Sequence, residues 1–189
     1  MSTDDLQAED APASAYDMSH VDEAETRATF AVIVDNESGV LHRVVGLFAA
    51  RGYNIESLTV AETDRRAHTS RITIVTSGTR DVLRQIKAQL DKMVCVRGVQ
   101  DVTRDPLGVE RELALIKVRG SGAERVEALR VSDIFRAHVI DTTHSSFVFE
   151  LTGAPSKIDK FIELMRPLGL AEVSRTGVLS ITRGADDSV

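Results

Sequence analysis

The chain has 189 residues, of which 42% are apolar and 28% charged, a composition typical of a globular protein with one or two domains. Aromatic residues make up 4%, Trp is absent and the net charge is −6, so a base-stacking or polyanion-binding surface is not expected. The single cysteine, Cys95, excludes an intramolecular disulfide framework and a cysteine-based zinc site. No apolar run reaches membrane-spanning length, and the first residues lack a signal-peptide pattern. We therefore expect a cytoplasmic protein that binds neither membranes nor nucleic acid.

Acidic charge is concentrated at the start of the sequence. Residues 1–26 contain eight acidic side chains, no Lys or Arg and few large apolar groups. Such a segment buries too little surface to offset the entropy lost on ordering, so we predict a disordered acidic tail over 1–26. A partner-binding arm is the less favoured alternative. Residues 185–189 are predicted to be a short tail of the same kind.

Residues 27–104 predict the element order β-α-β-β-α-β. The segment 29–35 is a strand with few polar side chains on either face, as in a covered central strand. Apolar spacing from Val40 onward predicts an amphipathic helix that ends at Gly52. The remaining elements are strands over 54–63 and 69–76, a helix over 79–91, and a strand over 94–104 that bends at Gly98. This order is that of a ferredoxin-like domain.

A break at residues 105–108, Asp-Pro-Leu-Gly, marks a predicted domain boundary, after which the same order returns over 105–184. The elements are strands over 112–118, 137–142, 146–152, 170–174 and 178–182, and helices over 123–135 and from Pro155. The first of these helices is predicted to bury Val126, Leu129, Ile134 and Phe135. The overall expectation is an α+β fold of two ferredoxin-like βαββαβ domains.

Motifs typical of catalysis are missing from the sequence. It contains no dinucleotide-binding, phosphate-binding-loop, nucleophile-elbow or metalloprotease motif. The five histidines lack zinc-ligand spacing, and a metal site at His138 and His144 is much less favoured than ordinary surface positions. We therefore predict neither catalytic nor metal-ligating residues in this chain.

The turn between the first strand and the first helix has the composition of a small-ligand site. It reads Asp35-Asn36-Glu37-Ser38-Gly39-Val40-Leu41. Free N–H groups at a helix start attract a carboxylate, and Gly39 removes a side chain that would block its approach. Glu37 suits an ammonium group, and Val40 and Leu41 offer an apolar wall, so a small apolar amino acid would fit. The alternative, which spacing alone favours, is a well-capped turn without a ligand.

The segment after the first helix predicts contact between two copies of the chain. It reads RGYNIESL over 51–58 and leads into a strand that lies at a sheet edge in this topology. Pairing with the same strand of a second copy, across a two-fold axis, would extend the sheet. An edge protected by Glu56 and Glu62 is the alternative, and pairing is the favoured interpretation.

These segments resemble the regulatory (small) subunit of acetolactate synthase, also called acetohydroxyacid synthase. The resemblance spans residues 28–184 and is carried by NESGVLHRVVGLFAARGYNIESLTVAET, SRITIVTSG, IFRAHVIDTT and RTGVLSITRG. NESG followed by RGYNIESL is its most specific part. The first domain resembles an ACT domain, the regulatory, small-ligand version of the ferredoxin-like fold. His42, just after the turn, stands where some relatives carry Ser.

The resemblance implies a non-catalytic regulatory subunit that works with a catalytic large subunit. That partner would carry thiamine diphosphate, Mg²⁺ and FAD. It would convert two pyruvates to 2-acetolactate and CO₂, or condense pyruvate with 2-oxobutyrate, in branched-chain amino-acid biosynthesis. The regulatory subunit would raise this activity and confer feedback inhibition, with valine as the expected effector and leucine or isoleucine as the others.

The resemblance also implies a homodimer through the ACT domains, with the effector held between two copies. It places the effector contacts on the turn of one copy and the second strand of the other: Asn36, Glu37, Ser38, Gly39, Val40, Leu41, Asn54 and Ile55. Three other functions stay open. They are a free-standing ACT-domain sensor acting on another enzyme or a transcription regulator, an RNA-binding domain, and a small enzyme. No basic recognition helix, aromatic RNA-binding pattern or acid–base pair supports them.

Overall fold

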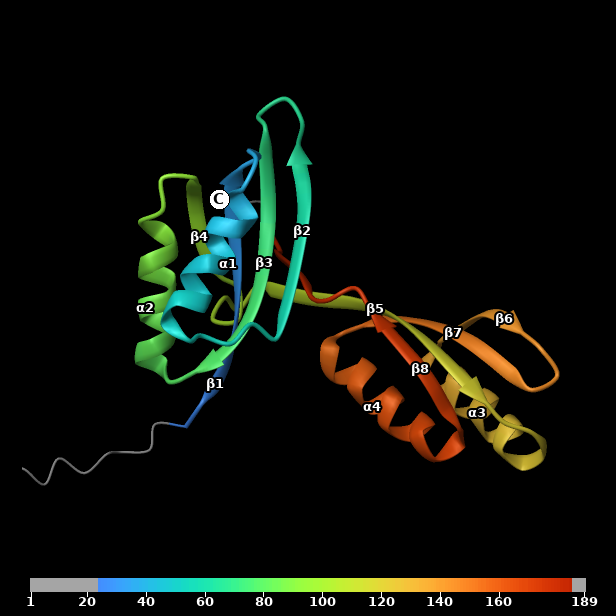
Figure 1. The fold of residues 1–189 in the computed structure, drawn as a ribbon. Coiled ribbons are helices and arrows are strands. Elements are labelled where there is room, and N and C mark those ends of the chain that lie inside the picture. Colours follow the sequence, from blue (N-terminus) through green and yellow to red (C-terminus); the bar gives the residue numbers. More distant parts are fainter. Residues whose placement is uncertain (1–23, 185–189) are drawn as a thin grey trace, which may run out of the picture.

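The computed structural model describes residues 24–184 (Figure 1). The predicted tail over 1–26 lies almost entirely outside the described residues, as does the one over 185–189. The N-terminal unit has the order that the sequence predicted: β1 (Thr26–Asp35), α1 (Val40–Arg51), β2 (Ser57–Asp64), β3 (Thr69–Gly78), α2 (Arg80–Asp91) and β4 (Val96–Asp101). Its strands form an antiparallel sheet in the order β2-β3-β1-β4, which places β2 at an edge.

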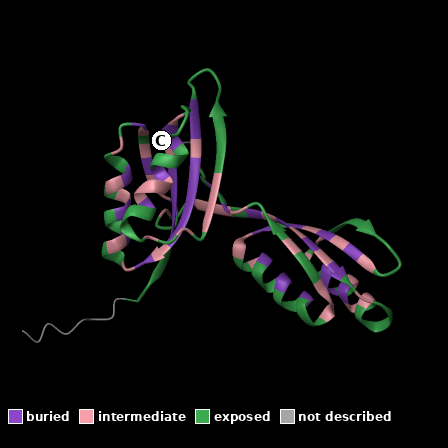
Figure 2. Cartoon of the chain, in the orientation of Figure 1, coloured by how far each residue is buried: buried purple, intermediate pink, exposed green. Residues whose placement is uncertain are grey.

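Helices α1 and α2 cover one face of this sheet (Figure 1). The core between them uses alternate side chains of the central strands, including Phe30 and Val32 on β1 and Ile72 and Ile74 on β3. Helix α1 ends at Gly52, as predicted. Figure 2 shows the buried residues gathered on the central strands, whereas most of β2 is exposed.

Strand β4 is irregular where the sequence predicted a bend. Ile33 pairs with Gly98, but Val34 pairs with Val96, so Arg97 is an extra residue in the ladder. Such a bulge bends the strand and turns the extra side chain out of the regular alternation. The Arg97 guanidinium is thereby free to reach the end of β1.

The C-terminal unit repeats the arrangement with a second sheet in the order β6-β7-β5-β8. Its elements are β5 (Gly108–Arg119), α3 (Gly122–Phe135), β6 (His138–Thr142), β7 (Ser146–Gly153), α4 (Pro155–Met165), the short 3₁₀ turn η1 (Arg166–Leu168), β8 (Leu170–Arg175) and β9 (Leu179–Thr182). The predicted α+β fold of two ferredoxin-like units is therefore confirmed. The domain boundary at residue 105 stays a prediction; it falls in the turn between β4 and β5.

The predicted buried face of α3 is wrong at two positions. Val126 and Ile134 are 67% and 69% exposed, whereas Ala128, Val131 and Ser132 are buried. Val126 and Ile134 lie two and six residues from Ala128. At 3.6 residues per turn, both spacings fall on the opposite side of the helix, so both side chains point away from the sheet. The small side chains of Ala128 and Ser132 allow the helix to approach the sheet closely. Leu129 and Phe135 pack partly against the core, as predicted.

Strand β5 joins the two units, because its halves pair with different strands. Gly108–Arg111 pairs with β9, and Glu112–Arg119 pairs with β7 in the second sheet. Figure 1 shows β5 as the long strand between the two lobes, with the C-terminal end of the described chain back at the first lobe. The sequence predicted 178–182 as a strand that closes the second domain; instead, β9 lies off that sheet's path.

Candidate functional site

The turn between β1 and α1 is shaped by backbone hydrogen bonds. The Asn36 N–H donates to the His68 carbonyl at 2.7 Å, and the Glu37 N–H donates to the Asp35 carbonyl at 2.9 Å. Gly39 has a φ of +83°, in the left-handed region that glycine adopts without strain. An added Cβ at Gly39 would meet nothing within 4 Å, so the space in front of the turn is open.

The start of α1 offers backbone donors for an anion. The backbone N–H of Arg43 donates to the Gly39 carbonyl, but no side chain of residues 24–184 caps the helix. Within the same residues, no acceptor is found for the N–H groups of Ser38, Gly39, Leu41 and His42. Unpaired N–H groups and the positive end of the helix dipole favour a carboxylate at this point. The turn therefore differs from the well-capped alternative that the sequence left open.

The acidic side chains of the turn are already paired with arginines. Asp35 binds Arg97 at 2.6 Å, and Glu37 forms an ion pair with Arg43. The hydrogen bond that Arg43 donates to Glu37 raises the pKa of Arg43, so its guanidinium stays charged. Because each acid is paired with an arginine, its repulsion of a carboxylate at the helix start is reduced. An ammonium group at the turn would have to share these acids with the arginines.

The remaining turn residues differ in what they present. The Asn36 side-chain amide donates to Glu62 at the far end of β2, at 3.1 Å. Val40 is 7% exposed and packs into the core, so it does not line the open side of the turn. Leu41 is 39% exposed and is the apolar surface available there.

Asn54 and Ile55 lie at the opposite end of the sheet from the turn. The Asn54 carbonyl accepts a hydrogen bond from Thr76, and Ile55 packs partly against the core just before β2 begins. Glu62, which touches the turn, follows Ile55 by seven residues. An extended strand covers about 23 Å over that length. The two groups of predicted contact residues in one chain are therefore too far apart to hold one small molecule.

The edge position of β2 offers a way to bring these groups together. Val60 is 43% exposed, and one side of the β2 backbone has no neighbouring strand within residues 24–184. Glu56 and Glu62 are engaged, the first with Arg27 at 3.2 Å and the second with Asn36. Antiparallel pairing of two β2 strands would set the end of each beside the start of the other.

A separate cleft of about 610 Å³ lies between the two units and was not found by sequence reasoning. Its charged residues are paired with each other. Arg175 donates to Glu112 at 2.8 Å and to Asp159 at 2.7 Å, and Arg27 reaches Glu110, just outside the cleft, at 3.4 Å. These pairs join residues up to 83 positions apart, so nothing in the local sequence indicates them.

Residues 24–184 contain no group of three or more His, Cys, Asp or Glu side chains placed to hold a metal ion. None of the helices described is long and apolar enough to cross a membrane.

Known proteins match both units. A family model described as "AHAS small subunit-like ACT domain" matches residues 30–97, and one described as "Small subunit of acetolactate synthase" matches residues 111–184. The chain is 45% identical to the isozyme 3 small subunit of acetolactate synthase from Escherichia coli over 159 residues, which is 84% of this chain and 96% of that protein. The chain belongs to the acetolactate synthase small subunit family.

Further relatives agree with this assignment. The acetolactate synthase small subunit of Bacillus subtilis is 45% identical over 153 residues, covering 80% of this chain and 87% of the relative. The crystal structure of the small subunit from Thermotoga maritima aligns with a TM-score of 0.74 at 36% identity, over 85% of this chain and 99% of that one. The predicted family and the ACT domain are thus confirmed. A small subunit of an enzyme implies a catalytic subunit as its partner.

Proposed function

We propose that this chain activates the catalytic subunit of acetolactate synthase and makes it sensitive to feedback inhibition by a branched-chain amino acid, valine in the first place. The catalytic subunit would carry thiamine diphosphate, Mg²⁺ and FAD and would form 2-acetolactate and CO₂ from two pyruvates. One observation carries the effector site. The N–H donors of the turn find no acceptor within residues 24–184, and the predicted partner residues of the turn lie at the other end of the same sheet.

The pocket would form between two copies of the ACT domain. The effector carboxylate would accept hydrogen bonds from the N–H groups at the start of α1. Its aliphatic side chain would lie against Leu41, with Asn54 and Ile55 supplied by the second copy. A binding site of this kind is complete only in the dimer, so effector binding and dimerisation should stabilise each other.

Inhibition then follows from thermodynamic linkage. An effector lowers activity only if it binds a less active state of the complex more tightly than an active one. Valine held between two copies would fix their relative orientation. The regulatory dimer would pass that constraint to the catalytic subunit.

The test compares two substitutions at Gly39 that differ in charge. Asp and Asn both tolerate the left-handed backbone and have nearly the same shape, but Gly39→Asp places a carboxylate beside that of the effector. Two such charges 4 Å apart repel by about 1 kcal/mol in water and about 4 kcal/mol in partly buried surroundings. We expect Gly39→Asp to abolish valine inhibition and to retain activation, and Gly39→Asn to bind valine at least about tenfold more tightly than Gly39→Asp.

The measurements are calorimetric titration of the purified chain with valine, leucine and isoleucine, and activity of the reconstituted holoenzyme. Unchanged valine sensitivity in Gly39→Asp would refute the site. A wild-type chain that binds none of the three amino acids and leaves the catalytic subunit's activity unchanged would refute the function.

A further inference from the structure

The C-terminal segment 176–182, which we name the strap, runs from the second unit back across the ACT domain. Its side chains alternate between buried and exposed: Val178 and Ser180 are 2% and 8% exposed, whereas Leu179 and Ile181 are 52% and 60% exposed. Such alternation indicates a strand with one face against another layer. That layer is the face of the ACT sheet that α1 and α2 leave uncovered.

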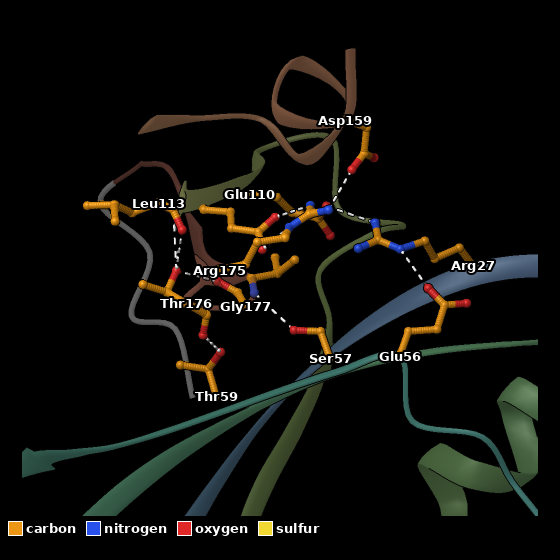
Figure 3. Close-up of polar contacts among 12 residues, drawn as sticks. Arg27, Glu56, Ser57, Thr59, Glu110, Leu113, Asp159, Arg175, Thr176 and Gly177 are labelled. Carbon is orange, nitrogen blue, oxygen red and sulfur yellow. Dashed lines mark hydrogen bonds and ion pairs between the residues drawn. The ribbon is translucent and has the colours of Figure 1, made fainter. Parts of the chain in front are cut away.

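The strap holds the edge strand β2 through two hydroxyl groups. The Val178 N–H donates to Ser57 Oγ at 3.1 Å, and Thr59 Oγ1 donates to the Thr176 carbonyl at 3.4 Å (Figure 3). Leu58, between the two hydroxyl residues, packs against the core beneath the helices. Ser57 and Thr59 therefore point to the opposite face, where the strap lies.

The close approach at this point requires a glycine. Gly177 lies between the two hydroxyl groups with a φ of +82°. A Cβ added to it would lie 2.7 Å from Ser57 Oγ and 2.8 Å from Thr59 Oγ1. Any larger residue would push the strap away from β2.

The other end of the strap is fixed to β4, at the opposite edge of the sheet. Gln100 Nε2 donates to Thr182 Oγ1 at 2.7 Å, and Thr182 Oγ1 donates to Asp105 at 3.1 Å. Since the sheet order is β2-β3-β1-β4, the strap spans the whole width of the ACT sheet.

Ion pairs join the same region to the body of the C-terminal unit. Arg175, directly before the strap, binds Glu112 on β5 and Asp159 on α4. Arg27 bridges Glu56, directly before β2, to Glu110 on β5 (Figure 3). The start of β2 is thus tied to the C-terminal unit by two independent sets of polar contacts.

We propose that the contact of Ser57 and Thr59 with Gly177 and Val178 transmits effector occupancy from the ACT domain to the C-terminal unit. The inference rests on the proposed function, because it takes Asn54 and Ile55 as effector contacts. These two residues lie just before Ser57 and Thr59 on the same segment. An effector that draws the start of β2 toward a second copy changes the position of both hydroxyl groups. The strap hydrogen bonds then form in one state of the protein and break in the other, which is the two-state element that coupling requires.

The test removes the two hydroxyl groups with little change of shape. In the holoenzyme with the catalytic subunit, the double variant Ser57→Ala, Thr59→Val should still activate and should bind valine within about threefold of the wild type. The valine concentration for half-inhibition should rise at least about tenfold, within the usual range of allosteric coupling. Thr63→Val is the matched control, because Thr63 Oγ1 on the same strand bonds to Thr69 inside the ACT domain; it should be inhibited like the wild type.

A second pair of variants tests the close approach. Gly177→Ala should reduce valine inhibition as the double variant does. Gly122→Ala should not, since Gly122 also has a positive φ, +57°, but an added Cβ there meets nothing within 4 Å. In the wild type, saturating valine should change the hydrogen-exchange rate of the Val178 amide at least about fivefold.

The outcomes separate the inference from the proposed function. If the double variant and Gly177→Ala are inhibited at wild-type valine concentrations, the strap contact transmits nothing, and the proposed function stands. If either variant loses valine binding itself, the contact belongs to the binding site and the inference fails. If the wild-type chain neither binds the effector nor activates, the proposed function and the inference fail together.

Discussion

At the scale of single residues, the charge of Arg175 is held by two carboxylates. Its guanidinium donates two hydrogen bonds to Glu112, a residue that is only 4% exposed, and a third to Asp159. These bonds raise the pKa of Arg175 above its usual value, with the hydrogen bond to Glu112 as the largest cause. A raised pKa in the folded state stabilises the protein at every pH below the ordinary arginine value, and the effect is lost only at higher pH. The pair therefore stabilises the fold throughout the neutral range.

Replacing Glu112 by Gln should destabilise the protein by about 1–3 kcal/mol, because it leaves a partly buried guanidinium without its bidentate partner. Arg175 remains about one third exposed, and solvent limits the loss. The control is Glu163→Gln, which breaks a solvent-exposed pair with Lys160 and should leave the unfolding midpoint close to that of the wild type. Urea unfolding of the two variants measures the difference. Equal midpoints would contradict the structural role of Glu112.

At the scale of elements, the sequence predicted the α-helices and strands of residues 24–184, but it missed the short turn η1, the 108–111 part of β5 and some strand partners. Helix α4 has a strong apolar stripe, and Ile158 and Phe161 on that stripe are buried in the core. Helix α3 has a weak stripe, since its contact face contains the small residues Ala128 and Ser132, and an assignment by hydrophobicity chose exposed Val126 instead. A small side chain is buried only where two elements approach closely. The distance between a helix and a sheet is set by tertiary packing, so it cannot be predicted from the local sequence.

The exposed apolar residues of α3 give the second stability prediction. Ile134→Ser and Val126→Ser should each change the free energy of unfolding by less than about 0.5 kcal/mol, because both side chains are about two thirds exposed. In the same unit, Ile158→Ala should cost about 2–5 kcal/mol, because Ile158 is fully buried. Thermal and urea unfolding test both. A loss above 1 kcal/mol for either serine variant would mean that α3 packs against a further surface in the intact protein.

The strap shows a different limit of sequence reasoning. The segment 178–182 has a strand pattern, which was predicted, but its partner is the first half of β5 and its covering layer is the ACT sheet. Both the partner strand and the covering sheet involve residues 68–121 positions away. The turn at Gly39 was predicted because its signals are local, whereas the contact of Val178 with Ser57 depends on tertiary placement.

At the scale of the whole molecule, the edge strand β2 restricts how two copies can combine. In an antiparallel sheet, residues that face each other point to the same side. A two-fold axis normal to the sheet keeps each side chain on its own side, so facing residues of the two β2 strands must be an even number of positions apart in sequence. The residue at the axis therefore faces the same residue of the second copy. Leu58 and Val60 point to the helix-covered side with Ile74 and Ile72, their neighbours on β3. Pairing about the centre of β2 would bury Val60, which is 43% exposed in one chain.

Val60→Lys places a charge on the pairing edge of each copy, close to the two-fold axis, and edge lysines oppose strand pairing. We expect the dimer dissociation constant to rise at least about tenfold, measured by sedimentation equilibrium. Valine affinity should fall with it, measured by calorimetry at the same protein concentration. Ile181→Lys, which alters an apolar residue of the strap that is 60% exposed, should change neither quantity. A Val60→Lys chain that is monomeric and still binds valine with wild-type affinity would mean that the turn at Gly39 holds the effector without a second copy.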